Sequence, residues 1–267
     1  KNIISAIAVI SIMSLFSLSG CAKKGEEEAF LKAQRSLSEG NYTEALYLYR
    51  VFVEKFPESS LAPEGQLRIC RIYSRHLGDV KRAMDAYAML FYIYPASPQV
   101  YLAREDMAGI YSAADEPGKA IAEYVWLIEN GPAKGRDRHR YRMALEYVKT
   151  NDFRQARIEL EELLKDMPFT ELAPRVYYHI ALTHYLEGNL EEAIKAYDGV
   201  ISSFPGNPVC IDARLGKAAA LEESGRLAEA LALLTELEKE YSNSEVVRIR
   251  IESARARLRK EFNPKEG

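Results

Sequence analysis

Residues 33–57 read AQRSLSEGNYTEALYLYRVFVEKFP, and the arrangement of this stretch recurs along the chain. Its landmarks are a small residue, an alanine twelve residues later and a proline twelve residues after that, here Ala33, Ala45 and Pro57. Proline returns with gaps of 38, 37, 36 and 37 residues, at Pro57, Pro95, Pro132, Pro168 and Pro205. The alanine series runs one step further: Ala45, Ala83, Ala120, Ala156, Ala193 and Ala230.

Apolar residues keep fixed distances from these alanines. Four residues after them stand Tyr49, Tyr87, Tyr124, Leu160, Tyr197 and Leu234, and seven residues after them stand Phe52, Leu90, Leu127, Leu163, Val200 and Leu237. The earlier small residues are Ala33, Cys70, Ala108, Ala144, Ala181 and Ala218. Because offsets of 3, 4 and 7 residues lie on one helical face, each period predicts two amphipathic helices that approach closely at the small residue.

A short turn separates the two helices of each period: EGN at 39–41, LGD at 77–79, EPG at 116–118, TND at 150–152, EGN at 187–189 and SGR at 224–226. Glycine or asparagine in such a turn can take the left-handed conformation that ends a helix. The proline then ends the second helix, since it lacks an amide hydrogen. We expect the extra residue in the 38-residue gap to lie within Ser74–Asp79, between helices.

This pattern of small, aromatic, alanine and proline positions resembles the tetratricopeptide repeat, a helix–turn–helix unit. The resemblance covers roughly residues 26–242 and implies six repeats in an all-α, right-handed superhelical solenoid. After them, residues 243–262 place Val247, Ile251, Ala254 and Leu258 on one helical face. This segment predicts a helix that caps the exposed end of the solenoid and is followed by a tail over residues 263–267.

The first twenty residues predict a secretory signal peptide. The uncharged run Ile3–Leu18 follows Lys1 and is short for a membrane-spanning helix, although an uncleaved N-terminal anchor stays open as the alternative. Leu18-Ser19-Gly20-Cys21 resembles the bacterial lipobox. The resemblance implies cleavage after residue 20, acylation of Cys21 and a short tether over residues 21–25. Ala22 after the cysteine implies sorting to the outer membrane, with the repeats facing the periplasm.

The repeats are about 37 residues long, longer than the usual length of about 34 residues in this family. Some of them end in Phe-Pro or Tyr-Pro, as at Phe56-Pro57 and Tyr94-Pro95, and these units resemble two groups of envelope proteins. These are the BamD group of outer-membrane assembly lipoproteins and the Tol–Pal-associated periplasmic repeat proteins. The opening stretch AQRSLSEGNYTEALYLYRVFVEKFPESS resembles the start of BamD. The resemblance implies a scaffold for β-barrel assembly. A Tol–Pal or cell-envelope coordinator, a secretin pilotin, a polysaccharide-export accessory and a peptidoglycan- or glycan-binding module stay open.

The composition and the absence of catalytic motifs argue against an enzymatic role for this chain. The net charge of −3 provides no overall field for nucleic acid, so the expected partners are envelope proteins or peptides, and the membrane through acyl chains on Cys21. No HExxH, GxSxG, Walker or GxGxxG motif occurs, so we expect no enzyme, no cofactor and no metal. The histidines are expected to pack or face solvent: His76, His139, His179 and His184.

Two surfaces are candidates for partner binding. The first is the concave face, lined by first helices, whose predicted residues include arginine and tyrosine, the types enriched at binding hot spots. Core packing is the alternative for its tyrosines. The predicted groove residues are Leu67, Arg71, Glu105, Arg138, Tyr141, Leu145, Arg175, Tyr178, Leu182 and Tyr185.

The second candidate is an apolar strip on the convex side, formed by second helices. Six residues after the first three alanines stand Val51, Met89 and Trp126, where later repeats carry Glu162, Gly199 and Glu236. Tyr92 and Ile93 add to the same side, and Trp126 is the expected anchor. An exposed apolar strip marks an interface. Cover by neighbouring loops is the alternative.

Overall fold

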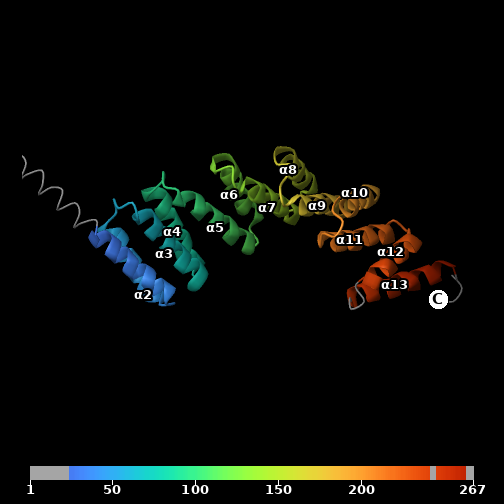
Figure 1. The fold of residues 1–267 in the computed structure, drawn as a ribbon, viewed down its shortest axis with the longest axis horizontal. Coiled ribbons are helices and arrows are strands. Elements are labelled where there is room, and N and C mark those ends of the chain that lie inside the picture. Colours follow the sequence, from blue (N-terminus) through green and yellow to red (C-terminus); the bar gives the residue numbers. More distant parts are fainter. Residues whose placement is uncertain (1–23, 241–244, 263–267) are drawn as a thin grey trace, which may run out of the picture. The chain divides into compact units, whose positions relative to one another are not determined.

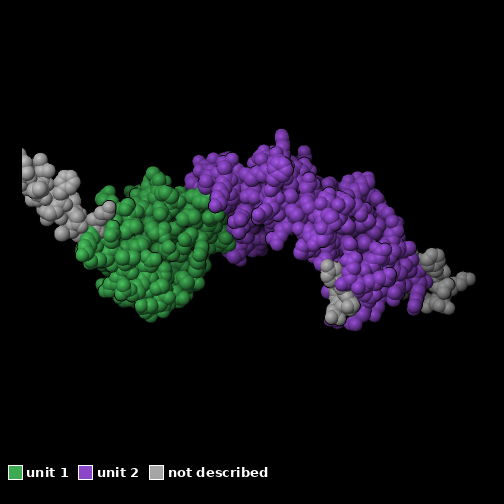
Figure 2. Space-filling model, in the orientation of Figure 1, with its two compact units in different colours: residues 1–110 green, residues 111–267 purple. Residues whose placement is uncertain are grey.

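The computed structural model describes residues 24–240 and 245–262, and this part of the chain consists of helices joined by short turns, with no strand (Figure 1). The chain divides into two compact units, residues 1–110 and 111–267 (Figure 2). The predicted signal peptide, the acylation site Cys21 and the predicted tail at 263–267 lie outside the described residues.

The first unit contains two complete helix pairs. A helix over residues 24–38 precedes α2 (Tyr42–Lys55), and α3 (Ala62–Arg71) continues into the π-helical segment η1 (Ile72–His76) before α4 (Val80–Ile93). α5 (Gln99–Ala113) then runs past the boundary of the unit. α3 packs against both α2 and α4, and the fully buried side chains of this unit include Tyr49, Leu67 and Tyr87.

The second unit repeats the same arrangement. Its helices after α5 are α6 (Pro117–Asn130), α7 (Arg136–Lys149), α8 (Phe153–Asp166), α9 (Ala173–Leu186), α10 (Leu190–Ser203), α11 (Val209–Glu223), α12 (Leu227–Glu240) and α13 (Glu245–Phe262). Each packs on the next, and α9 also contacts α11, so these two first helices of successive pairs are neighbours. α13 buries Val247 and Ile251 against Leu234 and Leu237 of α12, which confirms the predicted capping helix.

The repeating sequence positions form the core in both units. All six marker alanines, from Ala45 to Ala230, have no exposed surface, and the six small residues of the first helices are equally buried. The side chains four and seven residues after the alanines are at most 3% exposed. The predicted all-α stack of helix–turn–helix repeats is therefore confirmed. A residue larger than alanine or cysteine at the small position would separate helices that depend on close approach.

One backbone hydrogen bond closes the turn of every repeat. Near the end of the first helix a carbonyl accepts from the N–H of the residue that precedes the second helix. The donor–acceptor pairs are Asn41–Ser36, Asp79–Tyr73, Glu116–Tyr111, Asp152–Tyr147, Asn189–His184 and Arg226–Leu221. The second pair is separated by six residues and the others by five, and η1 occupies this place. The extra residue of the second repeat therefore widens the end of the helix into a π turn instead of lengthening the loop.

Five of the six turns contain a glycine or asparagine with positive φ, as predicted: Gly40, Gly78, Asn151, Gly188 and Gly225. The third turn differs from the prediction in its position. Pro117 of the expected EPG turn is the first residue of α6, and Asp115 takes the left-handed conformation instead of Gly118. Proline fits the first turn of a helix because its missing N–H has no partner there.

We expect Gly188→Ala to destabilise the protein by about 1–2 kcal/mol, because a Cβ is unfavourable at a φ of 83°. Gly188→Asn should cost less, since Asn151 already adopts a φ of 59° at the equivalent position. Urea unfolding of both variants measures the difference. Equal stability of the alanine variant and the parent would show that this turn does not depend on the left-handed residue.

Candidate partner-binding surfaces

In the second unit, α7 and α9 bring two predicted groove tyrosines together around a histidine. The ring of His179 lies 5.4 Å from the ring of Tyr141 and 5.1 Å from that of Tyr178, both edge-to-face. His179 Nδ1 lies 2.9 Å from the carbonyl oxygen of Arg175, so the ring donates to its own helix. We call Tyr141, Tyr178 and His179 the aromatic cluster. Sequence reasoning assigned His179 to packing or solvent and missed that it joins the two tyrosines.

Partial burial sets the electrostatics of the aromatic cluster. Burial raises the pKa of Tyr141 and of Tyr178, and it lowers the pKa of His179, with the positive charge of Arg175 acting in the same direction. All three side chains are half-buried, and Tyr178 also packs against Tyr197 of α10 at 6.0 Å. Core packing and partner binding are therefore compatible for Tyr141 and Tyr178. Each tyrosine packs against its neighbours with one side of its ring and keeps another side exposed.

Arg138 on α7 and Arg175 on α9 are exposed, and their guanidinium groups make no hydrogen bond or ion pair with another described residue. Other arginines of this unit are paired, such as Arg157 with Glu187 at 2.6 Å. Arg138 and Arg175 therefore keep all their donors for a carboxylate from outside. Tyr185, by contrast, donates a short hydrogen bond to Glu223 of α11, which raises its pKa to about 12.

In the first unit, most of the predicted groove residues contact other residues of the same unit and do not face solvent freely. Arg71 donates to Asp106 at 2.6 Å, and Asp106 also pairs with Arg75 and lies 3.4 Å from the hydroxyl of Tyr87. Leu67 has no exposed surface, so its prediction as a groove residue is wrong and it belongs to the core. Glu105 on α5 is half-buried.

The predicted convex strip is exposed in the first unit. Val51 on α2 is 40% exposed, and Met89 and Tyr92 on α4 are 53% and 87% exposed. Trp126, its expected anchor, lies on α6 in the second unit and is half-buried. Whether these residues bind a partner stays a prediction.

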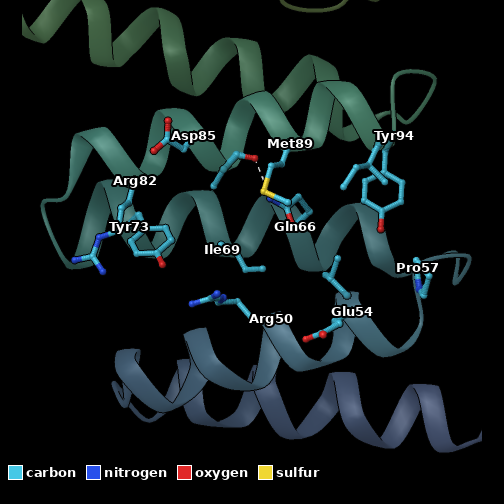
Figure 3. Close-up of a pocket in the computed structure, with 13 residues that line it drawn as sticks. Arg50, Glu54, Pro57, Gln66, Ile69, Tyr73, Arg82, Asp85, Met89 and Tyr94 are labelled. Carbon is cyan, nitrogen blue, oxygen red and sulfur yellow. Dashed lines mark hydrogen bonds between the residues drawn. The ribbon is translucent and has the colours of Figure 1, made fainter.

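The structure contains a groove of about 750 Å³ between α2 and α4, whose lining includes Met89 and Ile93 from the predicted convex side (Figure 3). Ile69 and Gln66 of α3 and Tyr73 of η1 form its floor. Its walls carry Val53 of α2 and Met89 of α4. We call this surface the α2–α4 groove.

A buried hydrogen bond fixes the floor of the α2–α4 groove. Gln66 is 3% exposed, and its side-chain N–H donates to the carbonyl oxygen of Ala86 on α4 at 2.9 Å, as Figure 3 shows. At one end, the guanidinium of Arg82 lies 5.1 Å from the ring centre of Tyr73 and pairs with Asp79 at 2.6 Å. Polar as well as apolar contacts therefore hold α3 and η1 against α4 at the floor of the groove.

Among residues 24–240 and 245–262, no group of three or more His, Cys, Asp or Glu side chains could hold a metal ion. None of the helices in this same part has the length and apolar character needed to span a bilayer.

Family profiles of the tetratricopeptide repeat match residues 28–59, 141–208 and 184–258. Together with the six buried repeat positions, these matches show that the chain belongs to the tetratricopeptide repeat proteins. No curated protein matches the sequence.

Solved structures share the fold along most of the chain. A tetratricopeptide repeat protein from Parabacteroides merdae is 21% identical, with 86% of this chain and 87% of that chain covered and a TM-score of 0.61. PilW, described as a widely conserved type IV pilus biogenesis factor, is 15% identical, with 85% and 98% covered and a TM-score of 0.56. YrrB, described as a TPR protein with an unusual peptide-binding site, is 14% identical, with 77% and 97% covered and a TM-score of 0.54. At these identities the likeness concerns the fold, which is that of the tetratricopeptide solenoid.

Proposed function

We propose that this chain is a non-catalytic scaffold that binds other proteins of the bacterial envelope. The observation that carries the proposal is the surface of α7 and α9, where two exposed arginines, whose guanidinium groups pair with no other described residue, stand beside the half-buried aromatic cluster. Tyrosine and arginine are the side chains that contribute most at protein interfaces. The tetratricopeptide fold, which YrrB shares and which is described there with a peptide-binding site, supports the same role.

The chemistry of this surface defines the partner segment. Arg138 and Arg175 can each hold a carboxylate through paired N–H groups, and the aromatic cluster offers flat apolar faces beside them. A segment with an acidic residue next to an aliphatic or aromatic one satisfies both. A glycan would use the tyrosines but leave the two guanidinium groups without a charged partner.

We also propose that acyl chains on Cys21 hold the scaffold at the outer membrane, facing the periplasm. The lipobox resemblance of Leu18–Cys21 and the residue Ala22 support this proposal. Two or more acyl chains anchor a protein stably where one does not. In a precursor that carries Cys21→Ser, we expect loss of radiolabelled palmitate and loss of the protein from the membrane fraction. Palmitate retained by this variant would contradict acylation at Cys21.

The specific assignment is a BamD-like component of β-barrel assembly, supported by the resemblance of the opening repeat. A second candidate is a secretin pilotin, which the likeness to the type IV pilus biogenesis factor PilW favours. Affinity purification from solubilised membranes separates them, because barrel-assembly subunits support the first and a secretin supports the second. Retention of peptidoglycan fragments without protein would contradict both.

The binding surface is tested with a matched pair of double variants. Arg138→Glu with Arg175→Glu should reduce partner recovery at least tenfold, because the change reverses both guanidinium charges. Arg154→Glu with Lys195→Glu changes the net charge equally at exposed positions on α8 and α10, and it should leave recovery unchanged. Equal recovery with both double variants would remove α7 and α9 as the binding surface.

A further inference from the structure

We infer that the α2–α4 groove binds one amphipathic helix of a partner protein, about three turns long, with apolar side chains spaced three and four residues apart. This inference names a partner class and rests on the proposed scaffold function. The site lies on the side formed by second helices in the first unit, and it shares no residue with the surface of α7 and α9.

Two apolar side chains on one wall of the groove are exposed. Met89 is 53% exposed and Ile93 is 40% exposed, and both line the α4 wall. Val53 of α2 and the buried Ile69 of α3 also line the groove. A partner side chain placed among these four residues would be removed from contact with water on several sides. This burial favours binding by about 25 cal/mol for each Å² of apolar surface that is covered.

The shape of the groove matches a helix. Its lining residues form three rows at helical spacing, one on each of α2, α3 with η1, and α4. Along α4 the row runs from Arg82 to Ile93, eleven residues apart, which corresponds to roughly 16 Å at about 1.5 Å per residue. Three turns of a partner helix have the same length and present one apolar side chain to each turn of the wall.

An extended peptide fits this surface less well. Among the described residues no strand is present, and the groove walls are helices whose backbone groups bond within the helices. An added strand would find no free row of N–H and C=O groups to pair with. A helix brings its own backbone hydrogen bonds and needs only side-chain contacts.

Charges on the rim define the polar side chains of the bound helix. Figure 3 shows Arg82 and Asp85 toward the Tyr73 end, and Arg50 and Glu54 stand four residues apart on α2, about one turn. Arg50 and Glu54 make no hydrogen bond or ion pair with another described residue, whereas Arg82 is paired with Asp79. Complementary charges across an interface fix the register of a bound partner. The partner helix therefore places an acidic side chain at Arg50 and a basic side chain one turn away at Glu54, beside its apolar row.

The test uses the full lipidated chain in phospholipid nanodiscs and a panel of fluorescein-labelled 18-residue peptides. The panel peptides carry leucine at spacings of three and four, with one lysine and one glutamate a single turn apart beside the leucines. We expect saturable anisotropy changes at micromolar concentrations. Placing a proline in the middle of a peptide should weaken binding at least tenfold, because the helix is broken. Exchanging the lysine and glutamate positions should weaken it several-fold.

Matched variants locate the binding. Met89→Glu with Ile93→Glu should weaken peptide binding at least tenfold, and both positions are exposed enough that the folded state tolerates the change. Leu31→Glu with Tyr47→Glu replaces two other exposed apolar residues, 57% and 62% exposed, and should have no effect. Thermal unfolding followed by circular dichroism checks that both double variants fold.

Four results would overturn the inference. They are no binding by any panel peptide, equal binding of the proline peptides, unchanged binding to the Met89 and Ile93 variant, or occupation of the groove by something else. A dimer lost on Met89→Glu in light scattering identifies a second copy of this chain, and a fluorescent fatty acid that binds the parent and is not displaced by any panel peptide identifies an acyl chain. The Arg138 and Arg175 variant must keep peptide binding. Failure here with partner recovery intact therefore leaves the scaffold function standing.

Discussion

Gly216→Ala is expected to destabilise the second unit by about 1–3 kcal/mol, although alanine is normally the better residue inside a helix. Gly216 lies on α11, and a Cβ placed there would be 2.4 Å from Cζ of Tyr197 and 2.6 Å from its hydroxyl oxygen. Tyr197 has no exposed surface, so its ring cannot move into solvent. α10 and α11 must therefore separate to admit one methyl group.

Gly199→Ala is the matched control, because Gly199 lies inside α10 and a Cβ there meets nothing within 4 Å. This variant should be more stable than the parent by up to about 1 kcal/mol from helix propensity alone. Urea unfolding of both variants gives the comparison. Adding Tyr197→Leu to Gly216→Ala should cost less than the sum of the two single changes, since the shorter side chain vacates the contact. Stabilisation by Gly216→Ala would contradict the close packing of these helices.

Acidification from pH 6.5 to pH 4 is expected to remove about 3 kcal/mol of stability through His139 alone. His139 on α7 is 2% exposed, and burial, aided by the charge of Arg142, lowers its pKa from 6.5 to about 4. The folded state therefore binds fewer protons than the unfolded state in this range. The stabilisation is complete above pH 6.5, decreases as the pH falls and is lost at pH 4.

His139→Phe should flatten this dependence, because phenylalanine keeps a ring beside Tyr124, whose centre is 6.2 Å from that of His139, and carries no titrating group. Chemical unfolding at pH 7.5 and pH 4.5 measures the loss for both proteins. Burial also lowers the pKa of His179 and His184, so a smaller loss in the same direction should persist. His76→Phe is the control, since His76 is exposed. An unchanged loss in His139→Phe would exclude His139 as its source.

The helix pairs could be predicted because their determinants are local. An alanine such as Ala45 and the aromatic residue four positions later face inward whatever the neighbouring repeat contains, and proline ends a helix without tertiary help. The left-handed turn residues follow from glycine and asparagine in the same way. Asp115 was not predicted as the left-handed residue, because Gly118 of the EPG sequence was expected to take that conformation. Pro117 instead begins α6, so the turn lies earlier in the sequence.

The binding surfaces were less predictable because they depend on which side chains meet between helices. Arg71 and Asp106 are 35 residues apart, and only the packed structure shows that their ion pair occupies a predicted groove residue. His179 joins the aromatic cluster because α7 and α9 are neighbours. The α2–α4 groove arises where Gln66 occupies the floor and bonds to Ala86, a contact with no sequence signature.

The central claim is that this chain acts by holding another protein, and site-specific photocrosslinking in membranes tests it most directly. A photoreactive residue at Arg175 or at Met89 should give a discrete protein adduct, whereas the same residue at the exposed Lys195 should give none. Absence of any protein adduct at both Arg175 and Met89, or equal adducts at Lys195, would contradict the account.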